Sequence, residues 1–157
     1  MLSRTAEHAL RAVLVLADRN GGRALPAGEI AELLGVPRNY LAKTLQRLVR
    51  SGVLQSVRGP GGGFRLVRDP CDLPISAVLS EFDPVEPVDH CLLGYQSCDA
   101  GNPCAAHDRW TAWSRELSRL LDHTTIGHLL ADCDGEAVAT GNGGVGVSGK
   151  RTVKRER

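Results

Sequence analysis

The stretch PRNYLAKTLQRLVRSGVLQSVRGPGGGFRLV, residues 37–67, decides the fold of this chain. Its first half predicts a helix from Pro37 to Ser51, because a proline at the first helical position loses no hydrogen bond and Gly52 ends the pattern. Its second half consists of two short alternating runs around a glycine-rich turn, which is the pattern of a β-hairpin. The stretch therefore predicts a helix followed directly by a two-stranded wing.

The predicted helix has an apolar face and a polar face. At ~3.6 residues per turn, one arc of about 100° collects Leu41, Leu45, Leu48 and Val49. The other side carries arginine, lysine, asparagine and glutamine, which can contact base edges and phosphates in a DNA major groove. A plain solvent-facing surface can have the same composition, and the flanking elements favour DNA. The predicted DNA contacts, including those on the hairpin, are Arg38, Asn39, Tyr40, Lys43, Thr44, Gln46, Arg47, Arg50, Arg58, Gly61 and Arg65.

Two further helices are predicted before this stretch. Apolar spacing indicates a helix over 5–18, and a short helix over 26–34 ends at Gly35 in the manner of a C-terminal cap. The glycines of the hairpin do not read as a nucleotide-binding loop, because no Gly-Lys-Ser/Thr follows them and no helix begins there. Helix, short helix, basic helix and basic-tipped hairpin predict a winged helix-turn-helix domain over residues 1–70, with 37–51 as the recognition helix.

The second part of the chain, residues 71–133, predicts a cysteine loop and further helices. A short helix is expected over 73–82, a long one from Ala105, and one or two helical turns over 126–133. The long helix carries the apolar stripe Trp110, Trp113, Leu117, Leu120 and Leu121. We expect this stripe to be a dimer seam, with packing against the chain's own first domain as the alternative. The fold class is therefore mainly α, with a small β-hairpin wing and a long C-terminal dimerisation helix. Residues 134–157 are rich in glycine and end in a basic run, so we expect a disordered tail.

Charge is divided unevenly between the two halves. Residues 1–70 hold 11 Lys and Arg against 5 Asp and Glu, whereas residues 71–133 hold 3 against 10. A basic first half is suited to a polyanion such as double-stranded DNA. No apolar run approaches the ~20 residues of a membrane span, so no membrane partner and a cytoplasmic location are expected. The sequence offers no nucleophile–base pair and no acidic dyad, so an enzyme is not expected.

The loop CLLGYQSCDAGNPCAAH, residues 91–107, gathers three cysteines and a histidine with the spacing C-x6-C-x5-C-x2-H. This spacing is looser than the C-x2-C pairs of structural zinc sites. The odd cysteine total and the expected cytoplasmic setting disfavour a disulfide framework. Thiols and an imidazole in a glycine-containing loop suit an iron–sulfur cluster, while zinc and metal-free redox thiols remain alternatives. Cys71 and Cys133 lie outside this loop and are expected to be small buried side chains.

The chain resembles the Rrf2 family of bacterial regulators over about residues 1–133. The resemblance is carried by LSRTAEHALRAVLVLA, VPRNYLAKTLQRLVRSGVLQS, RGPGGGFRL and NPCAAHDRWTAWSRELSRLLDHTTIGHLLAD, with the cysteine loop between the last two. Within the family, the chain is most similar to the iron–sulfur branch of IscR- and NsrR-type regulators.

This resemblance implies a homodimeric regulator, expected to repress, that binds a partly palindromic operator with an affinity set by its cluster. It implies a 2Fe–2S cluster on Cys91, Cys98, Cys104 and His107, with 4Fe–4S as the other type. In NsrR-type members a carboxylate replaces the histidine, and the matching residue is Glu7 of the partner subunit. The first two cysteines are one residue further apart than in those subgroups, which leaves nitric oxide, iron, peroxide and redox state open as signals.

Overall fold

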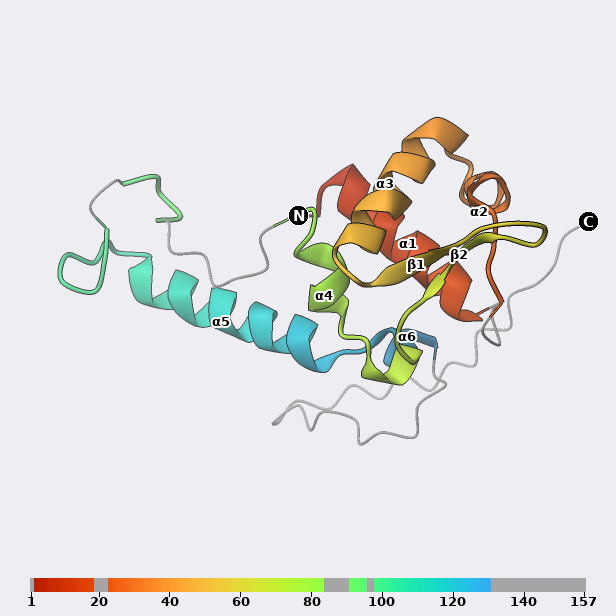
Figure 1. The fold of residues 1–157 in the computed structure, drawn as a ribbon. Helices are drawn as coiled ribbons and strands as arrows, with labels where there is room; N and C mark the ends of the chain where they lie inside the picture. Colours follow the sequence, from red (N-terminus) through yellow and green to blue (C-terminus); the bar gives the residue numbers. More distant parts are fainter. Residues whose placement is uncertain (1, 19–22, 84–90, 96–97, 131–157) are drawn as a thin grey trace, which may run out of the picture.

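The structure, a computed structural model, describes residues 2–18, 23–83, 91–95 and 98–130 (Figure 1). Its elements along the chain are α1 (Arg4–Asp18), α2 (Ala27–Leu34), α3 (Arg38–Arg50), β1 (Leu54–Val57), β2 (Gly63–Leu66), the 3-10 turn η1 (Pro70–Asp72), α4 (Ile75–Leu79), α5 (His107–His123) and α6 (Ile126–Leu130). The predicted tail over 134–157 lies outside the described residues. No helix within the described part of the chain is both long and apolar enough to cross a membrane.

The helix-turn-helix unit forms where the sequence predicts it. Gly35 ends α2 at φ 67°, a left-handed conformation that glycine adopts without a steric penalty. Pro37 stands immediately before α3 rather than at its first position, with φ −60° and ψ 131°. The helix predicted over residues 37–51 is therefore confirmed to within one residue at each end.

The wing is an antiparallel pair of strands in which Leu54 faces Leu66 and Val57 faces Gly63. It is fixed to the helices by two backbone hydrogen bonds between Leu25 and Phe64, one in each direction, of 3.0 and 2.8 Å. Gly63 is required there, because a Cβ atom at this position would lie 2.2 Å from the carbonyl oxygen of Leu25. The wing is thus anchored at its base, and its tip projects away.

One hydrophobic core joins the first three helices to the elements that follow the wing. Its fully buried large side chains include Leu16, Ile30, Leu41, Leu45, Leu48, Leu54, Leu73, Leu79 and Ile126. The backbone N–H of Ile126 donates to the carbonyl of Leu73 at 2.8 Å, so α6 is held against the stretch before α4. The core of the winged part therefore continues beyond residue 70.

The helix predicted over 73–82 is shorter than expected. η1 is capped by the side chain of Asp69, which accepts from the backbone N–H of Cys71 at 2.8 Å. Pro74 then has an extended backbone, with ψ 150°, and only Ile75–Leu79 is helical. Cys71 is exposed and disulfide-bonded, so the prediction of a small buried side chain was wrong for this residue. Cys133 lies outside the described residues.

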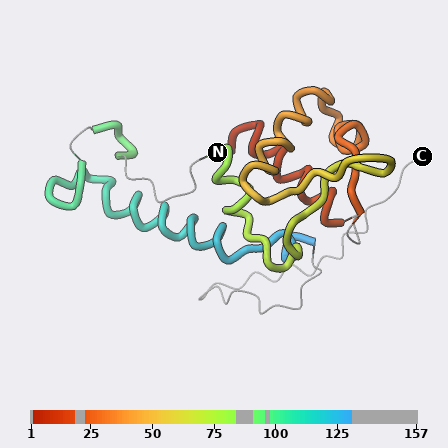
Figure 2. The backbone as a smooth tube through the Cα atoms, in the orientation of Figure 1, coloured from red at the N-terminus to blue at the C-terminus, as the bar shows by residue number. Residues whose placement is uncertain are grey.

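Helix α5 runs outward from the winged part and leads to the cysteine-containing segment at its far end (Figures 1 and 2). Its stripe is largely uncovered in the single chain: Trp113, Leu117 and Leu120 are 54%, 41% and 56% exposed. Trp110 and Trp113 stack with ring centroids 5.1 Å apart. Only Leu121 at the inner end packs against the core, so the stripe as a whole does not fold back on its own domain.

Candidate DNA-binding surface and cysteine centre

The outer face of α3 is a basic and polar surface. Arg38, Asn39, Lys43, Gln46 and Arg50 are all exposed there, as the sequence predicts. At the tip of the wing Arg58 and Gly61 are exposed, and Arg65 faces Gln55 across the two strands. Recognition helix and wing together present cations and hydrogen-bonding side chains of the kind that contact DNA bases and phosphates.

Thr44 does not belong to this surface. Its side chain is buried, and its hydroxyl donates to the carbonyl oxygen of Tyr40 at 3.2 Å. The reason is its position, three residues after Leu41 and four before Leu48, which places it on the apolar face. The prediction that Thr44 contacts DNA is therefore corrected: it is a core residue of α3.

Tyr40 connects the recognition helix with the start of α1. Its hydroxyl donates to Oγ1 of Thr5 at 3.3 Å and lies 3.2 Å from Nδ1 of His8. The rings of Tyr40 and His8 meet edge to face, with centroids 5.6 Å apart. Tyr40 is half-buried at the edge of the polar face, where it fixes the position of α3 relative to α1.

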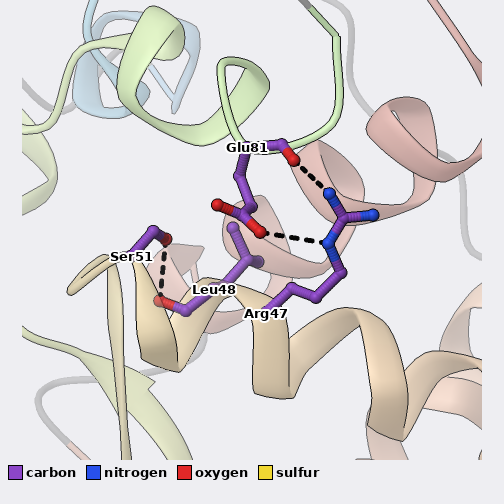
Figure 3. Close-up of polar contacts among 4 residues, drawn as sticks. All are labelled: Arg47, Leu48, Ser51 and Glu81. Atoms are coloured by element: carbon purple, nitrogen blue, oxygen red, sulfur yellow. Dashed lines mark hydrogen bonds and ion pairs between the residues drawn. The ribbon is translucent and has the colours of Figure 1, made fainter.

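Arg47 is engaged within the protein. Its Nε donates to Oε1 of Glu81 at 3.0 Å, and a terminal nitrogen donates to the backbone carbonyl of Glu81 (Figure 3). The guanidinium also lies 4.4 Å from the centroid of the Phe82 ring. Sequence reasoning missed Glu81 and Phe82, because the sequence carries no signal that pairs the end of α4 with α3.

The three loop cysteines converge. Their sulfur atoms all lie within 4.8 Å of one another, and those of Cys91 and Cys104 are 3.5 Å apart. Nδ1 of His107 lies 3.3 Å from the sulfur of Cys98, on one side of the group. This donor set of three thiols and an adjacent imidazole fits an iron–sulfur cluster or a thiophilic ion. Glu7, the rival ligand, pairs with Arg11 of its own helix at 3.6 Å.

The surroundings shift the pKa values of Cys91 and Cys98 in opposite directions. Burial raises the pKa of Cys91, but the backbone N–H groups of Tyr95 and Leu93 and the neighbouring thiols outweigh it and lower that pKa to about 7. The backbone N–H of Cys104 lowers the pKa of Cys98, yet burial and the thiols of Cys104 and Cys91 raise it overall. Cys91 thus forms the thiolate needed for metal binding and for nucleophilic attack more readily than Cys98 does.

Comparisons with known proteins found a family and named relatives that match this chain. The Rrf2 family model, described as "Iron-dependent Transcriptional regulator", matches residues 2–132. The HTH-type transcriptional regulator IscR of Yersinia pestis is 31% identical over 133 residues, covering 85% of this chain and 80% of the relative. IscR of Photobacterium profundum is 32% identical over 131 residues, covering 83% of this chain and 76% of the relative.

Solved structures share the fold. CymR, described as the global cysteine regulator of B. subtilis, superposes with a TM-score of 0.72 at 21% identity, covering 85% of this chain and 98% of CymR. IscR of T. potens superposes with a TM-score of 0.66 at 23% identity, covering 84% of this chain and 87% of the T. potens chain. These structures confirm the mainly α fold with a two-stranded wing. Together with the family match and the relatives, they show that the chain belongs to the Rrf2 family of transcriptional regulators.

Proposed function

We propose that this protein is a homodimeric DNA-binding repressor whose affinity for a partly palindromic operator is set by an iron–sulfur cluster. The observation that carries the proposal is the convergence of three thiols within 4.8 Å in a chain that also presents a winged helix-turn-helix. The relatives named IscR, and the family's description as iron-dependent, support the same conclusion.

Cys91, Cys98 and Cys104 would hold the cluster, with His107 as the fourth ligand. His107 supports this role because its ring nitrogen already lies beside Cys98. With three thiolates and one histidine, 2Fe–2S is the favoured type and 4Fe–4S the other. A cluster supplies an iron-dependent, oxidisable centre, so iron supply, redox state, peroxide or nitric oxide could act on it.

The dimer would form along α5. A stripe that exposes Trp113, Leu117 and Leu120 is the kind of apolar surface that a second copy covers. Because α5 carries the cysteine centre away from its own winged part, pairing of two such helices would bring each centre towards the partner. That is why Glu7 of the partner subunit stays a rival fourth ligand.

The chain's own residues would link the centre to DNA. Liganded cysteines hold 91–104 together at the start of α5, and α5 ends at the core of the winged part. Dimeric helix-turn-helix proteins need their recognition helices about one DNA turn apart, so a small change at α5 alters operator affinity. The exposed Lys43, Gln46 and Arg50 would contact the major groove, and Arg58 and Arg65 the phosphates beside it.

A metal-free thiol switch is the second candidate. The sulfurs of Cys91 and Cys104 lie 3.5 Å apart, and the pKa of Cys91 is lowered to about 7, so an oxidant could join them in a disulfide. CymR of B. subtilis, a structural neighbour, is described as a cysteine regulator. Zinc on the same thiols is the remaining alternative.

DNA binding with and without the cluster tests the proposal. Duplexes selected from a random library would be titrated anaerobically, by fluorescence anisotropy, with reconstituted and with metal-free protein. We expect the two dissociation constants to differ by about tenfold or more. Equal affinities would remove the sensing role, and the absence of any selected sequence would remove the regulator itself.

A further inference from the structure

The stretch that follows α4 contacts helix α3 and the residue just before α1. Glu81 binds Arg47 of α3 through both its carboxylate and its backbone carbonyl, and Phe82 lies under the same guanidinium. Asp83 accepts the backbone N–H of Ser3, just before α1, at 2.7 Å. We call Glu81 and Phe82 the Arg47 clamp.

The clamp is anchored on its own side. The backbone N–H groups of Phe82 and Asp83 donate to the carbonyl of Leu79 at 2.8 and 2.9 Å, which continues the last turn of α4. Phe82 also packs against the hydrophobic core. The clamp is therefore a fixed part of the winged body, and the movable partner is the long side chain of Arg47.

The clamp competes with DNA for the charge of Arg47. Two donors of the guanidinium and one of its faces are occupied, and its positive charge is matched by Glu81 at 3.0 Å. The two donors that bind Glu81 cannot also bind a phosphate, and the carboxylate already offsets the positive charge that would attract one. Yet Arg47 lies between Lys43 and Arg50 in the helix, and its side chain is still 40% exposed. The Arg47 guanidinium is therefore close enough to the polar face of α3 to contact a DNA phosphate once it is released from Glu81.

We propose that Glu81 is a positioning residue that withholds Arg47 from DNA, so that opening the clamp adds one phosphate contact per subunit. This inference rests on the proposed function, because it presupposes that the polar face of α3 meets DNA. Glu81 precedes Cys91 by ten residues on the stretch that joins α4 to the cysteine loop.

The test compares Glu81→Ala, Arg47→Ala and the double variant of the full chain. Glu116→Ala is the matched control, because it removes the same charge from an exposed ion pair with Arg119 on α5. Each protein is titrated into a fluorescein-labelled duplex of arbitrary sequence at several salt concentrations. Non-specific duplex reports phosphate contacts directly, since log affinity falls with log salt by ~0.9 per phosphate neutralised.

We expect Glu81→Ala to tighten binding several-fold at low salt and to steepen the salt dependence by about 0.9 per subunit. In the Arg47→Ala background, Glu81→Ala should leave the slope of log affinity against log salt unaltered. Glu116→Ala should leave this slope unaltered both in the wild type and in the Arg47→Ala background. An equal effect of Glu81→Ala in the two backgrounds would mean that only long-range charge is involved, and this would overturn the proposal. An unchanged slope in the wild-type background would overturn it as well.

Thermal melting of wild type, both single variants and the double variant separates the clamp from the proposed function. If the contact forms, the melting temperatures are non-additive: Arg47→Ala costs fewer degrees once Glu81 is gone. Additive melting temperatures would show that the clamp does not form. If no variant binds DNA while melting is non-additive, the proposed function fails, and the withholding of Arg47 from DNA fails with it, although the contact itself remains.

Discussion

Nδ1 of His107 lies 3.3 Å from the sulfur of Cys98, and the backbone N–H of His107 donates to the carbonyl of Cys104 at 3.0 Å. His107 is also the first residue of α5. One residue therefore contacts two of the three cysteines and begins the helix with the exposed apolar stripe. Through His107, the cysteine centre and the proposed dimer seam form one continuous structure.

His107 is expected to be the fourth ligand. Replacement with alanine should weaken cluster retention by at least about tenfold, the loss that even outer-shell partners of a metal site cause. It should also shift the visible absorption of the anaerobically reconstituted protein. His123→Ala, at the other end of α5, is the control. A spectrum that is changed by Glu7→Ala but not by His107→Ala would assign the ligand to the partner subunit's Glu7.

Near neutral pH, Cys91 is expected to be more reactive than Cys98. The thiolate is the nucleophile, so alkylation by iodoacetamide should rise as pH passes about 7, where the lowered pKa of Cys91 lies. The pKa of Cys98 is raised, so its alkylation should rise only at higher pH. Mass spectrometry of metal-free protein quenched at a series of pH values would measure both. Equal pH profiles for the two cysteines would contradict the geometry of the loop.

The outer face of α3 and the wing are expected to act differently on DNA. Lys43→Ala should weaken binding to the selected duplex by about 1–3 kcal/mol if it contacts a base. Arg58→Ala should flatten the salt dependence by about 0.9 per subunit, because it would remove a phosphate contact. Arg115→Ala on α5 serves as the charge control. Full affinity in both variants would exclude this face as the DNA surface.

Thr44 is expected to act on stability rather than on DNA. Its buried hydroxyl bonds the carbonyl of Tyr40, so Thr44→Val should change the free energy of unfolding by about 1 kcal/mol or less. The salt dependence of DNA binding should stay as in the wild type. Urea unfolding would measure the free energy of unfolding, and a separate anisotropy titration of the folded protein would measure the salt dependence of DNA binding. A flatter salt dependence in a stably folded Thr44→Val protein would restore Thr44 to the DNA surface.

The apolar stripe of α5 is expected to hold the dimer. Leu120→Glu would bury an unpaired charge in the seam, which should weaken the free energy of dimerisation by about 3 kcal/mol or more. The dimer dissociation constant should therefore rise at least about 100-fold. Leu129→Glu is the matched control, because Leu129 is similarly exposed, at 47% against 56%, but lies on α6. Light scattering after size-exclusion chromatography would distinguish the states. A dimeric Leu120→Glu protein would place the seam elsewhere.

Local patterns predicted most of the fold. The cap at Gly35, the spacing of Leu41, Leu45 and Leu48, and the glycines of the hairpin are interactions between near neighbours in the chain, so the sequence reveals them. The burial of Thr44 was also available from its spacing to Leu48. For Thr44, the position in the helix decides burial, and the polar residue type does not.

Contacts between residues far apart in the chain could not be predicted from the sequence. The Arg47–Glu81 pair joins residues 34 positions apart, and nothing in either segment marks the other. The clustering of Cys91, Cys98 and Cys104 was indicated by their spacing, but the place of His107 beside Cys98 depends on where α5 begins. Cys71 was misjudged because a disulfide depends on a partner that the local sequence does not identify.

The proposed iron–sulfur cluster is tested most directly by anaerobic purification, followed by a visible spectrum and by quantification of iron, sulfide and zinc per chain. We expect coloured protein with charge-transfer bands and matched iron and sulfide, about two of each per chain for a 2Fe–2S cluster. Loss of iron and sulfide in a Cys98→Ser variant would tie them to the loop. Colourless protein that holds zinc, or that holds no metal after attempted reconstitution, would contradict the cluster and leave a zinc-bound or metal-free thiol regulator.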